Sequence, residues 1–121
     1  MARILFVDDD PLTLETLMHA VELFGHHAIL ASTGEDARAI AHEQKPDLII
    51  VDMMLPDMEG VDLVQSLHDC DETSNIPMLM LSASPELDAT ERAKAAGARA
   101  YINKPVRLQA LLDTIQKYAA K

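Results

Sequence analysis

The feature that most constrains the fold of this chain is a short apolar run, residues 48–51, that stops at a carboxylate, Asp52. All four residues of the run are apolar and three are β-branched. Such a continuous run is typical of a strand covered on both faces of a parallel sheet. Pro56 and Gly60 then indicate a loop, because proline lacks an N–H donor and glycine tolerates unusual backbone angles. Asp52 is therefore predicted at the carboxyl end of a buried strand, where open α/β sheets bind ligands, although an aspartate there could equally cap the next element.

Apolar runs and helix-like segments alternate along the whole chain. Strand-like runs lie at residues 3–7, 27–31, 47–52, 77–82 and 99–103, and helix-like segments at residues 11–24, 33–43, 60–68, 84–96 and from 108 onward. Alternation of this kind predicts an α/β protein with a parallel sheet and helices on both faces. We expect five strands in the flavodoxin-like order 2-1-3-4-5.

Two of the predicted helices carry an apolar stripe at helical spacing. The stripes consist of Leu12, Leu14, Leu17, Met18, Val21 and Phe24 in the first helix and Leu108, Leu111, Leu112, Ile115 and Tyr118 in the last. The segment 84–96 is instead rich in alanine and only weakly apolar. We expect this helix to pack lightly and to move easily.

Length and composition exclude several classes of protein. The 121 residues fit a single domain over residues 1–121, and we expect no output domain in this sequence. No apolar run approaches the ~18 residues of a membrane span, and we expect no signal peptide, because the sequence goes straight into the first strand-like run. Cys70 is the only cysteine, so an internal disulfide is excluded, and its acidic neighbours disfavour a reactive thiolate. These features favour a cytoplasmic protein that does not associate with membranes.

The net charge is −10, from 20 acidic residues against 10 lysines and arginines. Binding to a nucleic-acid backbone requires a basic patch, and the sequence has no cluster of lysine or arginine, so direct nucleic-acid binding is not expected. An acidic chain suits a divalent cation if some of its acids converge.

Chemically active side chains stand at four of the predicted strand ends. They are Asp8 and Asp9 after the first strand, Asp52 at the third, Ser82 at the fourth and Lys104 at the fifth. Because the carboxyl ends of parallel strands meet at one edge of the sheet, these five side chains should converge. Clustered carboxylates repel one another, and a hard cation such as Mg²⁺, which prefers oxygen ligands, relieves that repulsion. Each residue alone could instead be a helix cap, a turn hydroxyl or a surface lysine.

These motifs resemble those of the receiver domains of bacterial two-component response regulators, over the whole chain. The motifs are Val7-Asp8-Asp9-Asp10, Asp52-Met53-Met54-Leu55-Pro56, Ser82-Ala83 and Lys104-Pro105, in the order and spacing of that family. The resemblance implies a phosphoacceptor switch that uses Mg²⁺, with Mn²⁺ as an alternative. A histidine kinase or phosphotransfer protein would donate the phosphoryl group, and a downstream protein or output domain would receive the signal. Such a domain assists its own phosphorylation and dephosphorylation but is not an enzyme with a separate substrate.

The resemblance also implies a role for each matching residue. Asp52 would be the phosphoacceptor, and the metal ligands would be Asp8, Asp9 and the backbone carbonyl of Met54, with Asp9 the more direct of the two acids. Ser82 would be the hydroxyl that bonds the phosphoryl group, and Lys104 would be the family's lysine, joined to Pro105 by a cis peptide bond. Tyr101 would be the aromatic residue of the switch. Tyr101 could instead be an ordinary aromatic residue of an edge strand.

Several features depart from the family's pattern or admit other functions. Arg99-Ala100 replaces the acids that many dimerising regulators carry, and Asp57 replaces a commonly small residue. A flavodoxin-type FMN carrier would share the fold, but three successive acids after the first strand would repel its phosphate. A receiver-like interaction module that works without phosphorylation is the second alternative, although such modules usually lack one of the key residues. The five histidines, His19, His26, His27, His42 and His68, are expected at the solvated surface rather than in a zinc site or phosphohistidine relay.

Overall fold

Ten elements alternate along the chain in the computed structural model, which describes residues 2–82, 87–103 and 107–119. The strands are β1 (Arg3–Val7), β2 (His27–Ala31), β3 (Leu48–Asp52), β4 (Met78–Ser82) and β5 (Ala100–Asn103), and the helices are α1 (Pro11–Glu22), α2 (Gly34–Gln44), α3 (Gly60–His68), α4 (Leu87–Ala96) and α5 (Leu108–Ala119). All strand pairs are parallel, and the order is β2-β1-β3-β4-β5. The predicted α/β fold and strand order are therefore confirmed.

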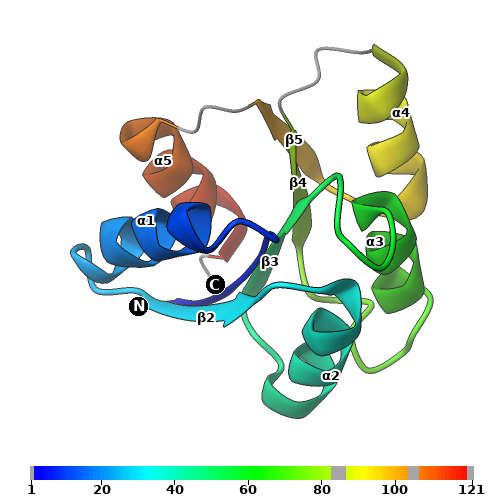
Figure 1. Ribbon diagram of the computed structural model, residues 1–121, viewed down its shortest axis with the longest axis horizontal. Helices are drawn as coiled ribbons and strands as arrows, with labels where there is room; N and C mark the ends of the chain where they lie inside the picture. The colour runs from blue at the N-terminus through cyan, green and yellow to red at the C-terminus, as the bar shows by residue number, and fades with distance from the viewer. Residues whose placement is uncertain (1, 83–86, 104–106, 120–121) are drawn as a thin grey trace.

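Helices cover both faces of the sheet, with α1 and α5 on one side and α2, α3 and α4 on the other (Figure 1). Successive strand residues point to opposite faces, so β1 divides its side chains between two cores. Ile4 and Phe6 pack with α1 and α5, whereas Leu5 and Val7 pack with the other three helices. All five residues of the central strand β3 are buried, which explains why its sequence is a continuous apolar run.

Local capping residues mark the ends of several helices. The Asp10 carboxylate accepts a hydrogen bond from the backbone N–H of Leu12 and caps α1, which begins at Pro11. Thr33 caps α2 in the same way. Gly97, the residue after α4, has φ +117, a left-handed conformation that favours glycine.

Three residues of the two apolar stripes do not lie in the core. Leu12, Phe24 and Leu108 are 70%, 57% and 43% exposed. Leu12 lies about 180° around the helix from Val21, a buried residue, at 100° per residue. Phe24 follows the end of α1, and Leu108 is the first residue of α5, whose buried residues are Leu111 and Ile115.

The α4 helix reaches the core through short side chains, Ala93 and Ala96, which are 1% and 2% exposed. Its easy movement stays a prediction, and its predicted start falls on residues 83–86, outside the described residues. Among the helices that the structure describes, none combines the length and apolar character needed to cross a bilayer.

Candidate functional site

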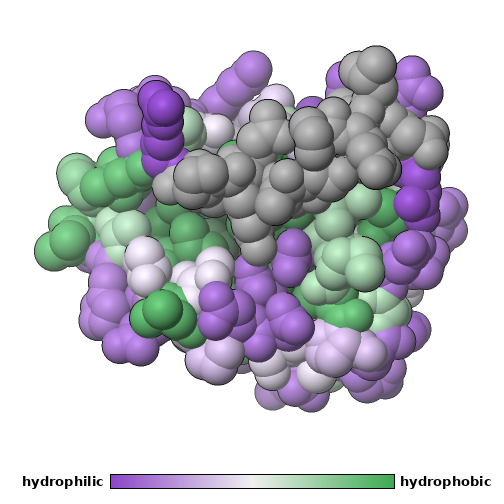
Figure 2. Space-filling view, turned by 45° about the horizontal axis from the view of Figure 1, so that its top comes forward, coloured by the Kyte–Doolittle hydropathy of each residue, from purple (hydrophilic) through white to green (hydrophobic). Residues whose placement is uncertain are grey.

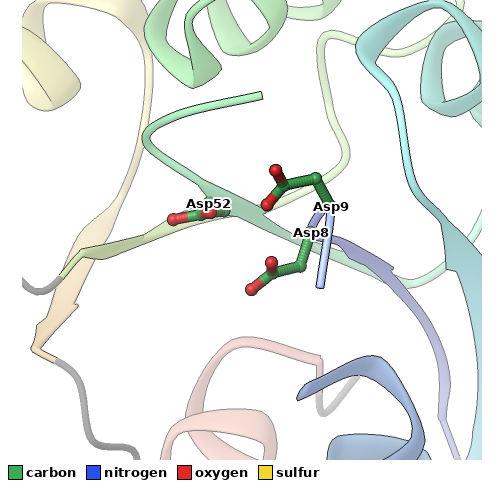
Figure 3. A group of neighbouring side chains, drawn as sticks. All are labelled: Asp8, Asp9 and Asp52. Carbon is green, nitrogen blue, oxygen red and sulfur yellow. The ribbon is translucent and has the colours of Figure 1, made fainter. Parts of the chain in front are cut away.

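Three carboxylates lie together at the carboxyl edge of the sheet, as the sequence predicts. Asp8 follows β1, and Asp52 is the last residue of the adjacent strand β3, with Val7 and Val51 in register. One oxygen from each of Asp8, Asp9 and Asp52 lies within 4.8 Å of the other two. Figure 3 shows the three side chains gathered at the end of β1 and β3. Asp8 and Asp52 are only 2% and 9% exposed, whereas Asp9 is exposed, so the group opens to solvent on the Asp9 side.

The three successive aspartates after β1 have two different roles. The backbone N–H of Asp8 donates to the Ala31 carbonyl at 3.1 Å and continues the pairing of β1 with β2. The N–H of Asp10 donates to Asp8 Oδ1 at 3.0 Å and orients that carboxylate. Asp10 itself caps α1 and accepts a further hydrogen bond from the Thr13 hydroxyl at 2.7 Å. The first two acids therefore belong to the carboxylate group and the third to the helix.

A tight loop of residues 53–59 follows Asp52. Met54 and Glu59 form an antiparallel bridge, closed by hydrogen bonds from Leu55 N–H to the Met58 carbonyl at 3.2 Å and from Gly60 N–H to the Met53 carbonyl at 2.8 Å. Neither bond uses the carbonyl of Met54, the proposed backbone ligand.

The first residue of α3 lies directly against the end of β3. A Cβ on Gly60 would overlap the Asp52 carbonyl oxygen and lie 2.9 Å from Met80 Cε. Only glycine allows this approach.

The donor set fits a hard divalent cation. All three side chains offer carboxylate oxygens, which suit Mg²⁺ better than a soft metal. Mg–O bonds of about 2.1 Å place two oxygens on one ion at most ~4.2 Å apart. Oxygens already within 4.8 Å therefore need only small side-chain rotations to share an ion. The third acid of the run after β1, Asp10, is the N-cap of α1.

Comparisons with known proteins agree with this geometry. The family model described as the response regulator receiver domain matches residues 4–116. The chain belongs to the response regulator receiver family.

Individual relatives cover nearly the whole receiver chain. It is 36% identical over 120 residues to protein PilH of Pseudomonas aeruginosa, covering 99% of both chains. It is 31% identical over 115 residues to the polar-differentiation response regulator DivK of Brucella anthropi, covering 95% of this chain and 94% of that one. Among solved structures, chemotaxis protein CheY4 of Vibrio cholerae superposes with a TM-score of 0.92 at 30% identity, covering 98% of each chain. The receiver family uses this fold in two-component signalling, and this membership decides against an FMN carrier.

The remaining predicted site residues of the receiver lie on β4, on β5 and just beyond β5. Ser82 ends β4 one residue after Leu81, the register partner of Asp52, so its backbone lies at the same edge of the sheet. Tyr101 lies on β5 opposite Met80, is partly buried, and packs against the core formed with α2, α3 and α4. Lys104 and its bond to Pro105 lie outside the described residues, so their roles stay predictions.

Sequence reasoning assigned no role to Asp57, a residue to which the structure gives a clear one. Its carboxylate accepts hydrogen bonds from the backbone N–H groups of Gly34 at 2.8 Å and Glu35 at 3.0 Å, at the amino end of α2. These bonds favour the charged form and lower the pKa of Asp57 from its ordinary value of 3.8. No local motif could have revealed this cap, because Asp57 lies 23 residues from Gly34 along the chain.

Proposed function

We propose that this receiver domain is a Mg²⁺-dependent phosphoacceptor switch in which Asp52 is phosphorylated. The observation that carries the proposal is the group of three carboxylates at the end of β1 and β3, in a chain of the receiver family. A nearly buried carboxylate beside two other acids has few structural uses, because like charges in close proximity destabilise the fold. The same arrangement is useful where a cation and a phosphoryl group bind together.

The chemistry follows from the positions of the acids. A phosphohistidine of a histidine kinase or phosphotransfer protein would approach the open side of the group, where Asp9 is exposed. A carboxylate oxygen of Asp52 attacks the phosphorus, the P–N bond breaks, and the imidazole leaves with the electron pair and takes up a proton. Hydrolysis removes the phosphoryl group when water attacks the phosphorus, the bond to the Asp52 oxygen breaks, and the free carboxylate and inorganic phosphate result.

Asp8, Asp9 and Asp52, with the Met54 carbonyl, would hold the metal ion. When bound, Mg²⁺ neutralises charge on the phosphoryl oxygens during transfer. Asp8 is held in place for this task by the Asp10 N–H. Lys104 would provide a second positive charge.

Large apolar side chains near the acids support a protein partner rather than a small substrate. Leu12 and Met54 are 70% and 69% exposed and lie within four residues of Asp8 and Asp52 in the sequence. Exposed apolar side chains beside a polar site are a common feature of surfaces that bind other proteins.

Phosphorylation would be transmitted through Ser82 and Tyr101. The new group adds about −1.5 to −2 charges and strong acceptor oxygens, and the Ser82 hydroxyl would bond one of them. That bond would draw the end of β4 inward and bias Tyr101, on the adjacent strand, between two positions. The surface of α4, β5 and α5 would then change its affinity for a downstream protein. Chemical shifts across this surface, measured with a stable phosphoryl analogue, should change in the parent protein and much less in Ser82→Ala. An unreduced response in Ser82→Ala would refute this route.

The proposed acceptor is tested by intact mass after treatment with acetyl phosphate and Mg²⁺. The parent protein should gain one phosphoryl group, and Asp52→Asn should gain none. Asp62→Asn, which removes an acid in the first turn of α3, is the matched control and should behave like the parent. Equal labelling of Asp52→Asn and the parent would refute the assignment. A parent that is never labelled would favour the alternative of an interaction module that works without phosphorylation.

A further inference from the structure

The loop of residues 53–59 is tied to α2 by a carboxylate from outside that helix. The first N–H groups of any α-helix have no helical carbonyl four residues earlier to which they can donate. In α2, the first ordinary helical bond runs from the Ala37 N–H to the carbonyl of the cap residue Thr33 at 3.1 Å. Of the three helical N–H groups before Ala37, that of Asp36 donates to the Thr33 hydroxyl at 3.1 Å, whereas those of Gly34 and Glu35 donate to Asp57. Two of these three N–H groups therefore depend for their acceptor on the loop of residues 53–59.

A second contact fixes the same loop on the same helix. The Met58 side chain occupies the space beside Gly34, where a Cβ would overlap its thioether. Asp57 and Met58 together thus attach the middle of the loop to the first residues of α2. The attachment at Asp57 is a pair of charge-assisted hydrogen bonds, which are stronger than bonds between neutral groups.

The same loop presents the backbone of Met54. The bridge between Met54 and Glu59 makes the loop a closed turn, so that its two halves move together. A loop anchored at Asp57 and Met58 therefore also restrains Met54, which lies three residues before Asp57. On the opposite side of the loop, the Glu59 carboxylate forms an ion pair with Arg92 of α4 at 2.8 Å. Both side chains are half-exposed, and surface ion pairs of this kind contribute little to stability.

We propose that Asp57 is a positioning residue for the metal site. By holding the loop on α2, it keeps the Met54 backbone beside the Asp8, Asp9 and Asp52 carboxylates and so raises the affinity of the site for Mg²⁺. This inference rests on the proposed function, because it assumes that the three acids bind Mg²⁺. It goes further in assigning a role to a residue that contacts neither the ion nor the phosphoryl group.

The inference has a reciprocal consequence. If anchoring the loop raises the affinity of the site for Mg²⁺, then bound Mg²⁺ must favour the anchored position of the loop over a released one by the same factor. Mg²⁺ should therefore slow hydrogen exchange at the amides of Gly34 and Glu35, the two donors to Asp57. A residue that merely caps α2 predicts no such response, because a cap alone has no coupling to the metal site.

Mg²⁺ titrations of the parent and two variants, followed by NMR, test the inference together with the exchange measurement. Asp57→Asn removes the charge and leaves only one acceptor atom for the two N–H groups. Asp36→Asn is the matched control, since it removes an exposed acid from the same end of α2 but leaves the two hydrogen bonds to Asp57 in place. We expect Asp57→Asn to bind Mg²⁺ about fivefold or more weakly than Asp36→Asn, and we expect Mg²⁺ to slow exchange at both amides in the parent.

The outcomes separate this inference from the proposed function. A parent that binds Mg²⁺ while Asp57→Asn and Asp36→Asn bind it equally well would overturn the inference alone. Unchanged exchange at Gly34 and Glu35 in a parent that binds Mg²⁺ would do the same, and this measurement needs no variant to fold. A parent that binds no Mg²⁺ would overturn both the metal site and the inference.

Discussion

Replacing Asp9 by asparagine should stabilise the metal-free protein while weakening its metal site. The oxygens of Asp8, Asp9 and Asp52 lie within 4.8 Å of one another. At that separation two charges repel by about 3.5 kcal/mol at an effective dielectric of 20 and by about 0.9 kcal/mol in water. Asp9 is exposed, and Asp8 and Asp52 also interact with other groups, so the net repulsion lies toward the lower figure. We expect Asp9→Asn to gain about 1–2 kcal/mol without metal, or about 3–10 °C in Tm for a domain of this size.

Magnesium should reverse this order of stability. Binding to the folded state raises stability by mass action, by about 2.7 kcal/mol when the free ion is at one hundred times its Kd. A variant that lacks one carboxylate ligand should gain much less.

Thermal unfolding of the parent and the variant, each with and without Mg²⁺, measures both effects. Asp71→Asn is the control, because Asp71 is an exposed acid in the turn before β4, at the opposite edge of the sheet. The reasoning would be refuted by an Asp9→Asn protein that is less stable than the parent without metal, or that is stabilised by Mg²⁺ as strongly as the parent.

Three further predictions concern single positions. Gly60→Ala should destabilise the protein by about 1–3 kcal/mol in urea unfolding, because the new Cβ overlaps a backbone carbonyl, whereas Gly34→Ala, whose Cβ meets only a flexible methionine side chain, should cost less. Thr73→Val should lower the free energy of unfolding by about 1–2 kcal/mol, because the fully buried Thr73 hydroxyl donates a 2.6 Å hydrogen bond to a carbonyl at the end of α3; no loss would show that this bond is unimportant. The pKa of Asp57 is lowered in the folded state, so its stabilising effect is complete above its ordinary value of 3.8 and is lost as pH falls through the lower folded value. The difference in urea midpoint between the parent and Asp57→Asn should therefore be present at neutral pH and shrink on acidification below that value, and a difference that grows there would contradict the assignment.

Much of the fold could be predicted because its signals are local. The continuous apolar run of β3 indicates burial on both faces, and the Asp10-Pro11 pair marks the start of α1. Parallel strands then bring their carboxyl ends to one edge, so residues that follow β1 and end β3 are predicted to meet without any knowledge of their contacts. This geometric rule is why Asp8, Asp9 and Asp52 could be grouped in advance.

Other features depended on which segments pack against each other. Helical spacing alone does not show which members of an apolar stripe are buried, and Leu12 and Phe24 belong to the stripe of α1 although both are exposed. The burial of Thr73 in a polar turn has the same origin, since its partner is a carbonyl on α3.

Asp57 shows most clearly what sequence and tertiary structure each decide. The sequence alone determines that an acid follows Pro56 in a loop, and that Gly34 begins a helix whose first N–H groups need acceptors. Only the fold brings the two together, because α2 and the loop after β3 lie on the same face of the sheet, 23 residues apart in the chain. Local propensity acts over a few residues, whereas hydrogen bonds of this kind depend on where the packed layers place the backbone. Figure 2 shows one face of the molecule, on which hydrophobic and hydrophilic residues lie side by side.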